Sequence, residues 1–267
     1  MIKNKIITIS VVMFLCVTIA VHAVTVIRGR GIRRVASGTP WDVSTNQVLH
    51  YKMNDDLADT VVIDSMTNSD GVLAGGDNTE DISEAGKINK ALHFNGADDR
   101  VLIADSPVMD SAAITAMAWI KMDAVGKEQM VITRDSGSVG DRYFLLYVGS
   151  NNKLRVYTWN SASTGVTFDG SNTLSASTWH HVAFTYTSGV TKVYLDGVVD
   201  GSTASQTGNL KTGDEPIYLG VQNYDSTFYS WFDGLIDDVR ILNRDLTVNE
   251  IAQIYNSGNG TEDDSNP

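Results

Sequence analysis

Short stretches in which apolar and polar residues alternate recur through most of this 267-residue chain, and they decide what it can fold into. Leu49, Tyr51 and Met53, for example, fall on one face of such a stretch, as a period of two requires of a β-strand. Gly, Asn and Asp, which favour turns, separate the stretches. We expect strands at 48–53, 91–94, 100–103, 114–122, 143–148, 153–159, 179–186, 191–195, 217–220 and 235–242. The pattern predicts an all-β antiparallel sandwich of the jelly-roll type.

One short helix is predicted at the end of this pattern. Thr247 and Glu250 have the spacing of a capping box, in which the hydroxyl and the carboxylate bind free amides of the first helical turn. Ile251, Ile254 and Tyr255 follow on one face. The chain after residue 256 is polar and acidic, so we interpret 257–267 as a tail.

Negative charge is concentrated in the part of the chain that carries the alternating pattern. The whole chain has 20 Lys and Arg against 32 Asp and Glu, a net charge of −12. Six of the basic residues and none of the acidic ones precede residue 41, so the remainder has 14 − 32 = −18. Such a surface repels phosphate backbones and argues against nucleic-acid binding. Of the acidic residues 26 are Asp, whose short carboxylates suit both turns and Ca²⁺.

The first 23 residues have the features of an export signal. Lys3 and Lys5 precede an apolar run over 6–21, and small or β-branched residues follow at 21 and 23. An uncleaved anchor is the alternative, because 6–27 is about long enough to span a bilayer. Both interpretations place the rest of the chain outside the cytoplasm, with membrane contact only through this segment. Residues 24–46 are interpreted as a linker, and 47–256 as the folded domain.

The order of the predicted elements resembles a known family. The matching stretches are 49–53, 64–68 with Gly71, 90–96, 98–101, 114–119, 179–182, 193–197, 232–241 and 243–247. Together they resemble the laminin-G-like jelly-roll domain of the concanavalin A-like lectin/glucanase superfamily, in the form common in bacterial surface proteins. The resemblance covers about 47–256 and implies two antiparallel sheets packed face to face. It does not imply one function, since this fold is found in lectins, adhesins, hydrolases and spacers.

A structural Ca²⁺ site is the first candidate site. The resemblance implies a cation between the loop holding Asp64, Asn68 and Asp70 and the aspartate of the last long strand, Asp237. Carboxylate and amide oxygens are the ligands that Ca²⁺ prefers. Asp237 is in phase with apolar residues of its strand, so we expect its carboxylate to point inward, where an unpaired charge is costly. The alternative is that the loop residues cap turns and that Asp237 pairs with an arginine.

Glycoside hydrolysis, by contrast, is not indicated. The reaction needs two carboxylates about 5–9 Å apart. None of the six glutamates has the Glu-x-Asp-x-x-Glu spacing found in the glucanases of this superfamily, and Glu250 belongs to the helix cap. The adjacent pairs Asp98–Asp99 and Asp237–Asp238 alternate between strand faces. We therefore predict no catalytic residues.

The candidate ligand-binding residues lie in an aromatic stretch before the last strand. Tyr224, Phe228, Tyr229 and Trp231 occur where relatives usually have small polar residues. Aromatic rings stack on the apolar faces of sugars and anchor protein interfaces. Tyr157 and Trp159, in phase on another strand, would extend such a surface. The alternative for the aromatic stretch is that two or three of its rings fill the core beneath the loop. The alternative for Tyr157 and Trp159 is core packing on the other sheet.

The sequence therefore favours a non-catalytic binding module outside the cytoplasm that recognises a glycan or a protein surface. A structural component of an envelope or matrix without a discrete ligand is the first alternative. A glycan-active hydrolase with an unrecognised acidic site is the second. The sequence carries no indication of the oligomeric state.

Overall fold

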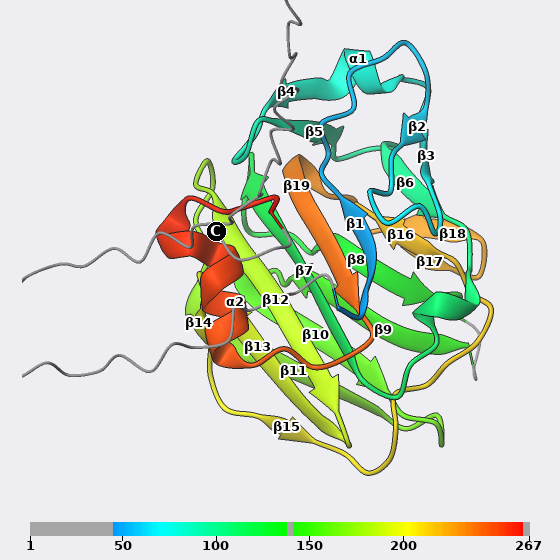
Figure 1. The fold of residues 1–267 in the computed structure, drawn as a ribbon, viewed down its shortest axis with the longest axis vertical. Helices are drawn as coiled ribbons and strands as arrows, with labels where there is room; N and C mark the ends of the chain where they lie inside the picture. Colours follow the sequence, from blue (N-terminus) through cyan, green and yellow to red (C-terminus); the bar gives the residue numbers. More distant parts are fainter. Residues whose placement is uncertain (1–44, 138–140, 264–267) are drawn as a thin grey trace, which may run out of the picture. The chain divides into compact units, whose positions relative to one another are not determined.

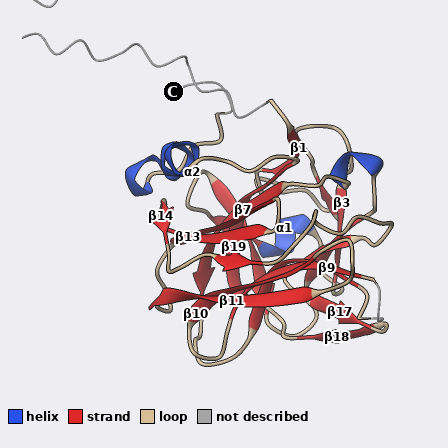
Figure 2. Ribbon diagram, turned by 90° about the horizontal axis from the view of Figure 1, so that it is seen from below, coloured by secondary structure: helices blue, strands red, loops and turns tan. Residues whose placement is uncertain are grey.

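The structure is a computed structural model that describes residues 45–137 and 141–263. The predicted signal peptide and almost all of the predicted linker lie outside these residues. Two large antiparallel sheets form the framework of the described chain, which confirms the predicted jelly-roll sandwich (Figure 1). Figure 2 shows the two layers, with β7 and β13 in one and β9 and β11 in the other. None of the helices among the described residues is long and apolar enough to cross a membrane.

The first sheet has nine strands. In spatial order they are β14 (Val198–Val199), β13 (Val190–Leu195), β12 (His180–Thr187), β7 (Ile114–Met122), β19 (Asp233–Leu242), β5 (Lys90–Asn95) and β4 (Ser83–Ala85), with β1 (Gln47–Tyr51) on β19 and β15 (Ala204–Ser205) on β13. The pairing of β1 with β19 joins the start of the domain to its last strand. The first sheet is therefore complete only when the first and the last strand of the domain have paired.

The second sheet has eight strands. They are β11 (Gly165–Thr173), β10 (Lys153–Trp159), β9 (Arg142–Val148), β8 (Gln129–Asp135), β16 (Ile217–Leu219), β6 (Arg100–Ile103), β3 (Gly71–Ala74) and β2 (Val61–Val62). A separate hairpin of β17 (Gln222–Tyr224) and β18 (Thr227–Tyr229) belongs to neither sheet. The helical segments are α1 (Thr79–Ile82), α2 (Val248–Tyr255) and the 3₁₀ turns Pro107–Met109 and Asn256–Gly258.

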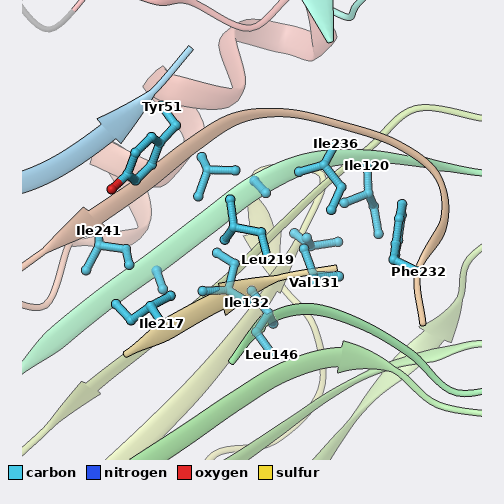
Figure 3. Packing of buried hydrophobic residues seen from close by; sticks show 14 of the residues in the cluster. Tyr51, Ile120, Val131, Ile132, Leu146, Ile217, Leu219, Phe232, Ile236 and Ile241 are labelled. Carbon is cyan, nitrogen blue, oxygen red and sulfur yellow. The ribbon is translucent and has the colours of Figure 1, made fainter. Parts of the chain in front are cut away.

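The core lies between the two sheets. Figure 3 shows Ile120 and Ile236 of the first sheet facing Ile132 and Leu219 of the second, all fully buried. Burying one such side chain stabilises the fold by about 1.5–3 kcal/mol. Predicted inward positions such as Leu49 are part of this cluster. The alternation read from the sequence is thus the alternation between core and outer face.

Helix α2 covers the outer face of the first sheet (Figure 1). The predicted capping box is present, with Thr247 and Glu250 binding each other's backbone amides. Ile251 and Ile254 pack on Met117 of β7. Tyr255 stacks on Trp119 with ring centroids 5.5 Å apart. Trp119 is thus buried under the helix rather than between the sheets.

A β-bulge in β19 changes the side to which the following residues point. The register with β7 shifts between Asp237 and Arg240, and Asp238 has a positive φ of 44°. Ile236 and Val239 both face the core between the sheets. Asp237 pairs with Trp119 and lies on the outer face instead. The expectation that Asp237 points into the core with the apolar residues of its strand is therefore wrong, because a bulge adds one residue to the strand.

Candidate functional site

The aromatic stretch forms the separate hairpin, and backbone contacts fix it to the second sheet. Asp225 and Ser226 at its turn have φ of 50° and 62°, as a tight two-residue hairpin turn requires. The Asp225 N–H donates to the Ser136 carbonyl at 2.7 Å. The amide of Gln222 donates to Asp135 Oδ2 at 2.8 Å. The hairpin is therefore held at both ends against the strand end of β8.

The two faces of the hairpin carry different aromatic residues. Tyr224 and Tyr229 share one face, with ring centroids 6.5 Å apart. They are 41% and 50% exposed, which makes them the most exposed rings of the aromatic stretch. Both rings present apolar surface to solvent at fixed positions. These two of the four predicted ligand-binding residues are available to a ligand.

The other two predicted residues pack against the sheet. Phe228 lies 5.7 Å from Trp231 and 5.8 Å from Tyr218, measured between ring centroids. The Arg100 guanidinium lies 4.3 Å from the centre of the Phe228 ring. Phe228 and Trp231 are half-buried in this cluster. The alternative that some of the rings fill space beneath the loop holds for these two.

Arg142 joins the hairpin to the aromatic residues of β10. Its guanidinium carbon lies 5.0 Å from the Tyr224 ring centre and 5.1 Å from that of Trp159. Trp159 in turn packs on Tyr157, with ring centroids 3.8 Å apart. Arg142 thus lies between the hairpin and the rings of β10, as the expected extension of the surface requires. Trp159 itself is only 5% exposed, so Tyr157 is the ring of this pair that reaches solvent.

Sequence reasoning missed two residues of this surface, Arg142 and Gly137. An arginine at a strand end has no distinctive spacing, so no pattern indicated it. Gly137 has a φ of +75°, and a Cβ atom there would lie 2.6 Å from the Tyr224 ring. The hairpin therefore docks closely only because residue 137 lacks a side chain.

The predicted metal-binding loop is organised by Asp64 rather than around an open site. Asp64 Oδ1 accepts hydrogen bonds from the N–H groups of His50 and Met66, at 2.9 and 3.0 Å. Its Oδ2 accepts from Asn68 and Ser69, at 2.8 and 3.2 Å. Four amides occupy the carboxylate, whose two oxygens have about four acceptor positions. Because these amides use the acceptor positions of the Asp64 carboxylate, Asp64 does not fit the role of a cation ligand.

Asp70 and Asn68 also serve the loop. Asp70 Oδ1 accepts from the Asp64 N–H at 2.9 Å, and the Asn68 side-chain amide donates to the Val48 carbonyl at 2.8 Å. Within residues 45–137 and 141–263, no group of three or more His, Cys, Asp or Glu is arranged to hold a metal ion. The structure therefore does not join Asp237 to this loop as one ligand set.

Asp237 has a different environment. Its carboxylate is fully buried on the outer face of the first sheet. Oδ2 accepts from the Ile88 N–H at 2.8 Å, whereas Oδ1 has no hydrogen-bond partner. Burial raises the pKa of Asp237 to about 8. An orphaned buried carboxylate oxygen fits either a bound cation or a proton.

The adjacent aspartates and the histidines take part in structural contacts. Asp238 binds His50 at 2.7 Å and Arg240 at 3.1 Å, and all three side chains are fully buried. Asp99 is buried and accepts from the Asn95 N–H. His180 Nδ1 lies 3.0 Å from Asp196 Oδ2 at a hairpin turn. These structural contacts account for the placement of these groups.

A cavity of about 340 Å³ lies among other residues, beside the start of the domain. Its lining includes Lys52, Met53, Leu57 and Ile63. Leu57 and Ile63 are 61% and 54% exposed. Nothing in the described chain specifies what would cover them, so the aromatic hairpin is the better supported candidate surface.

Comparison with known proteins identifies relatives of the fold. A family model described as the concanavalin A-like lectin/glucanases superfamily matches residues 95–252, more than half of the chain. None of the curated protein sequences matches the chain. The solved structures include domain 4 of AbnA, an extracellular arabinanase of Geobacillus stearothermophilus, in complex with arabinotriose. That likeness has 23% identity and a TM-score of 0.60, and covers 78% of this chain and 97% of that domain.

Two toxin domains are also similar in fold. The receptor binding domain of botulinum neurotoxin C/D mosaic serotype has 16% identity and a TM-score of 0.59, with 80% of this chain and 52% of that chain covered. The binding domain of Paraclostridial Mosquitocidal Protein 1 has 14% identity and a TM-score of 0.62, with 81% and 53% covered. The chain thus spans about half the length of these toxin domains. At these identities the likeness concerns the fold alone.

Proposed function

Because the chain belongs to the concanavalin A-like lectin/glucanase superfamily, we propose that it is a non-catalytic module that binds a glycan through the exposed face of the β17–β18 hairpin. The observation that carries this proposal is the pair Tyr224 and Tyr229, exposed side by side on a hairpin that is fixed to the sheet. A rigid aromatic surface binds with little loss of conformational entropy. The similar arabinanase domain was solved with arabinotriose, which supports a glycan as the ligand.

Chemistry at this face favours sugars for a second reason. Hydroxyl groups of a stacked sugar need hydrogen-bonding partners beside the rings, and the hairpin carries Gln222 and Asp225 next to Tyr224. A protein surface is the competing ligand, because tyrosine also anchors protein interfaces. Binding to a glycan array separates a glycan ligand from a protein ligand.

The test is binding to a glycan array followed by calorimetry on each positive glycan. Stacking of a ring contributes about 0.5–1.5 kcal/mol, so Tyr224→Ala with Tyr229→Ala should weaken binding by about tenfold or more. Leu57→Ala is the control, because Leu57 is also an exposed apolar residue but lines the separate cavity beside the start of the domain. Circular dichroism checks that each variant folds. Absence of binding to every glycan, or unchanged affinity in the double variant, contradicts the proposal, and release of reducing sugar contradicts its non-catalytic part.

The proposed location is outside the cytoplasm. The apolar run over 6–21 with Lys3 and Lys5 before it supports export. Cell fractionation tests the location, and N-terminal sequencing of the recovered protein distinguishes cleavage near residue 23 from a retained anchor. Recovery of the protein in the cytoplasm with Met1 intact contradicts export.

We also infer that Asp237 holds a structural Ca²⁺. The buried oxygen without a partner supports this, since a cation would neutralise a charge that burial opposes. Further ligands would be backbone carbonyls and water, both of which Ca²⁺ accepts. The ion would supply stability rather than chemistry.

A further inference from the structure

Arg142 has hydrogen-bond donors that the described residues do not use. Its Nε lies 3.5 Å from Asp135 Oδ1 as an ion pair and has no hydrogen-bond partner. Among the described residues, none accepts a hydrogen bond from the terminal amino groups of Arg142. The side chain is 25% exposed. A guanidinium has five N–H donors. Nε of Arg142 is buried, so the donors that a ligand can use are those of the two terminal amino groups.

Asp135 does not compete for that edge. Its Oδ1 accepts from the Gly137 N–H at 2.9 Å, and its Oδ2 accepts from the Gln222 amide at 2.8 Å. The carboxylate is fully buried. Asp135 thus balances part of the charge of Arg142 through space while its own hydrogen bonds hold Gly137 and the hairpin.

Two of the three other arginines of the second sheet differ from Arg142, while the third, Arg100, donates to the Asp98 carbonyl and lies over the Phe228 ring. Arg155 binds both oxygens of Asp169 through Nε and a terminal amino group. Arg134 binds Asp105 at 2.6 Å and Asp110 at 3.1 Å. Each of these has a carboxylate hydrogen-bonded to its guanidinium. Arg142 has the same chemistry without that partner, on the surface where Tyr224 is exposed.

The aromatic neighbours fix how Arg142 presents its free edge. The ring centres of Tyr224 and Trp159 lie 5.0 and 5.1 Å from its guanidinium carbon. Contacts of a cation with aromatic faces restrict its orientation without consuming N–H donors. A fixed planar fork binds a carboxylate through two parallel hydrogen bonds, which a lysine does not reproduce.

We propose that Arg142 binds the carboxylate of an acidic sugar whose ring stacks on Tyr224. This inference rests on the proposed glycan-binding function and narrows the ligand to glycans that contain uronic acid or another carboxylate sugar. A carboxylate is favoured over a sulfate because its two coplanar oxygens match the fork. The domain is negatively charged as a whole, so selection must come from direct contact rather than from long-range attraction, which salt screens beyond about 8 Å.

The test compares an acidic oligosaccharide with its neutral form. Calorimetry with oligogalacturonate and other uronate oligosaccharides, each beside its methyl ester, should show at least tenfold tighter binding of the acid. Arg142→Lys, which keeps the charge but loses the fork, should remove most of this preference, and Arg142→Gln should remove all of it. Lys192→Gln is the control, because Lys192 is an exposed cation on the first sheet and its loss should leave the preference unchanged.

Two outcomes overturn the inference. Equal binding of the acids and their esters, with binding still weakened by Tyr224→Ala together with Tyr229→Ala, refutes the role of Arg142 but leaves the glycan-binding proposal intact. Absence of binding to every acidic and neutral glycan refutes both. The lysine variant keeps this comparison valid if the glutamine variant does not fold.

Discussion

His50 Nε2 lies 2.7 Å from Asp238 Oδ1, and this contact joins the first strand of the domain to the last across 188 positions of the sequence. Both side chains are fully buried, and Arg240 Nε approaches the same carboxylate at 3.1 Å. A terminal amino group of Arg240 donates to the Thr261 carbonyl beyond α2. Burial alone would raise the pKa of Asp238, but Arg240 and His50 together hold this pKa below its usual value. The charged cluster thus links the first strand, the last strand and the segment that follows α2.

Asp238→Asn should therefore destabilise the domain strongly. Removing one partner of a buried ion pair leaves an uncompensated charge and costs about 3–5 kcal/mol. Chemical unfolding at pH 7 measures the difference. Asp56→Asn is the control, because its ion pair with Lys90 is solvent-exposed on both sides and should contribute less than about 1 kcal/mol. A loss at position 238 no larger than the control would show that the cluster does not stabilise the fold.

Stability should fall as the pH drops from about 6.5 to about 4, and His181 should be one cause. His181 is fully buried beside Trp119, and neither ring nitrogen has a hydrogen-bond partner. Burial lowers the pKa of His181 to about 4. The unfolded chain therefore binds a proton that the folded chain excludes, which costs about 3 kcal/mol across this interval.

In the absence of Ca²⁺, Asp237 acts with the opposite sign, because its raised pKa makes the folded chain hold a proton more strongly. The contribution of His181 to the pH dependence of stability is therefore measured as the difference between the protein and a variant that lacks this histidine. Unfolding free energies of the protein and of His181→Phe, at pH 7.5 and 4.5, isolate it. Parallel pH dependence in the two proteins would contradict the assignment to His181.

The sequence was most informative where each strand has one core face and one outer face. β6, β7 and β10 begin and end at the residues predicted for them. In β6 and β10 buried and partly exposed residues alternate with the pleat, whereas β7 is buried on both faces because α2 covers its outer face. The capping box likewise located α2, since the two residues that make it are close in sequence. The fold class follows from these local signals.

Other features depended on contacts that a sequence pattern does not contain. All seven residues of β8 are buried, so no alternation marks that strand, and β11 contains two glycines among half-exposed residues. The bulge at Asp238 reversed the predicted direction of Asp237. Tyr224 and Tyr229 were predicted as ligand-binding residues, but their separation from Phe228 and Trp231 follows from the pairing of β17 with β18. Arg142 is indicated as a ligand-binding residue only by its unused donors together with its aromatic neighbours, which no sequence pattern contains.

Gly137→Ala should displace the hairpin. The φ of +75° disfavours any L-residue by about 1–2 kcal/mol, and the new Cβ would lie 2.6 Å from the Tyr224 ring. Glycan binding should weaken because Tyr224 must move. Gly126→Ala is the matched control, since Gly126 has a φ of +87° with nothing within 4 Å of the added atom. The control should show the backbone strain without the loss of binding; equal effects of both variants on binding would contradict close docking of the hairpin.

Removal of Ca²⁺ should lower the melting temperature of the protein but not that of Asp237→Asn. At a dissociation constant of about 0.1 mM, Ca²⁺ at about 1 mM would stabilise the folded state by about 1.4 kcal/mol. The asparagine variant keeps an oxygen to accept from the Ile88 N–H while removing the buried charge that a cation would neutralise. Asp64→Asn is the informative comparison, because Asp64 binds four amides and should lose stability while keeping its response to Ca²⁺. If only the Asp64 variant lost the effect of Ca²⁺ on the melting temperature, the ion would bind in the loop at 64–70 instead. Equal melting temperatures of the unmodified protein in Ca²⁺ and in EDTA would show that a proton alone keeps Asp237 neutral.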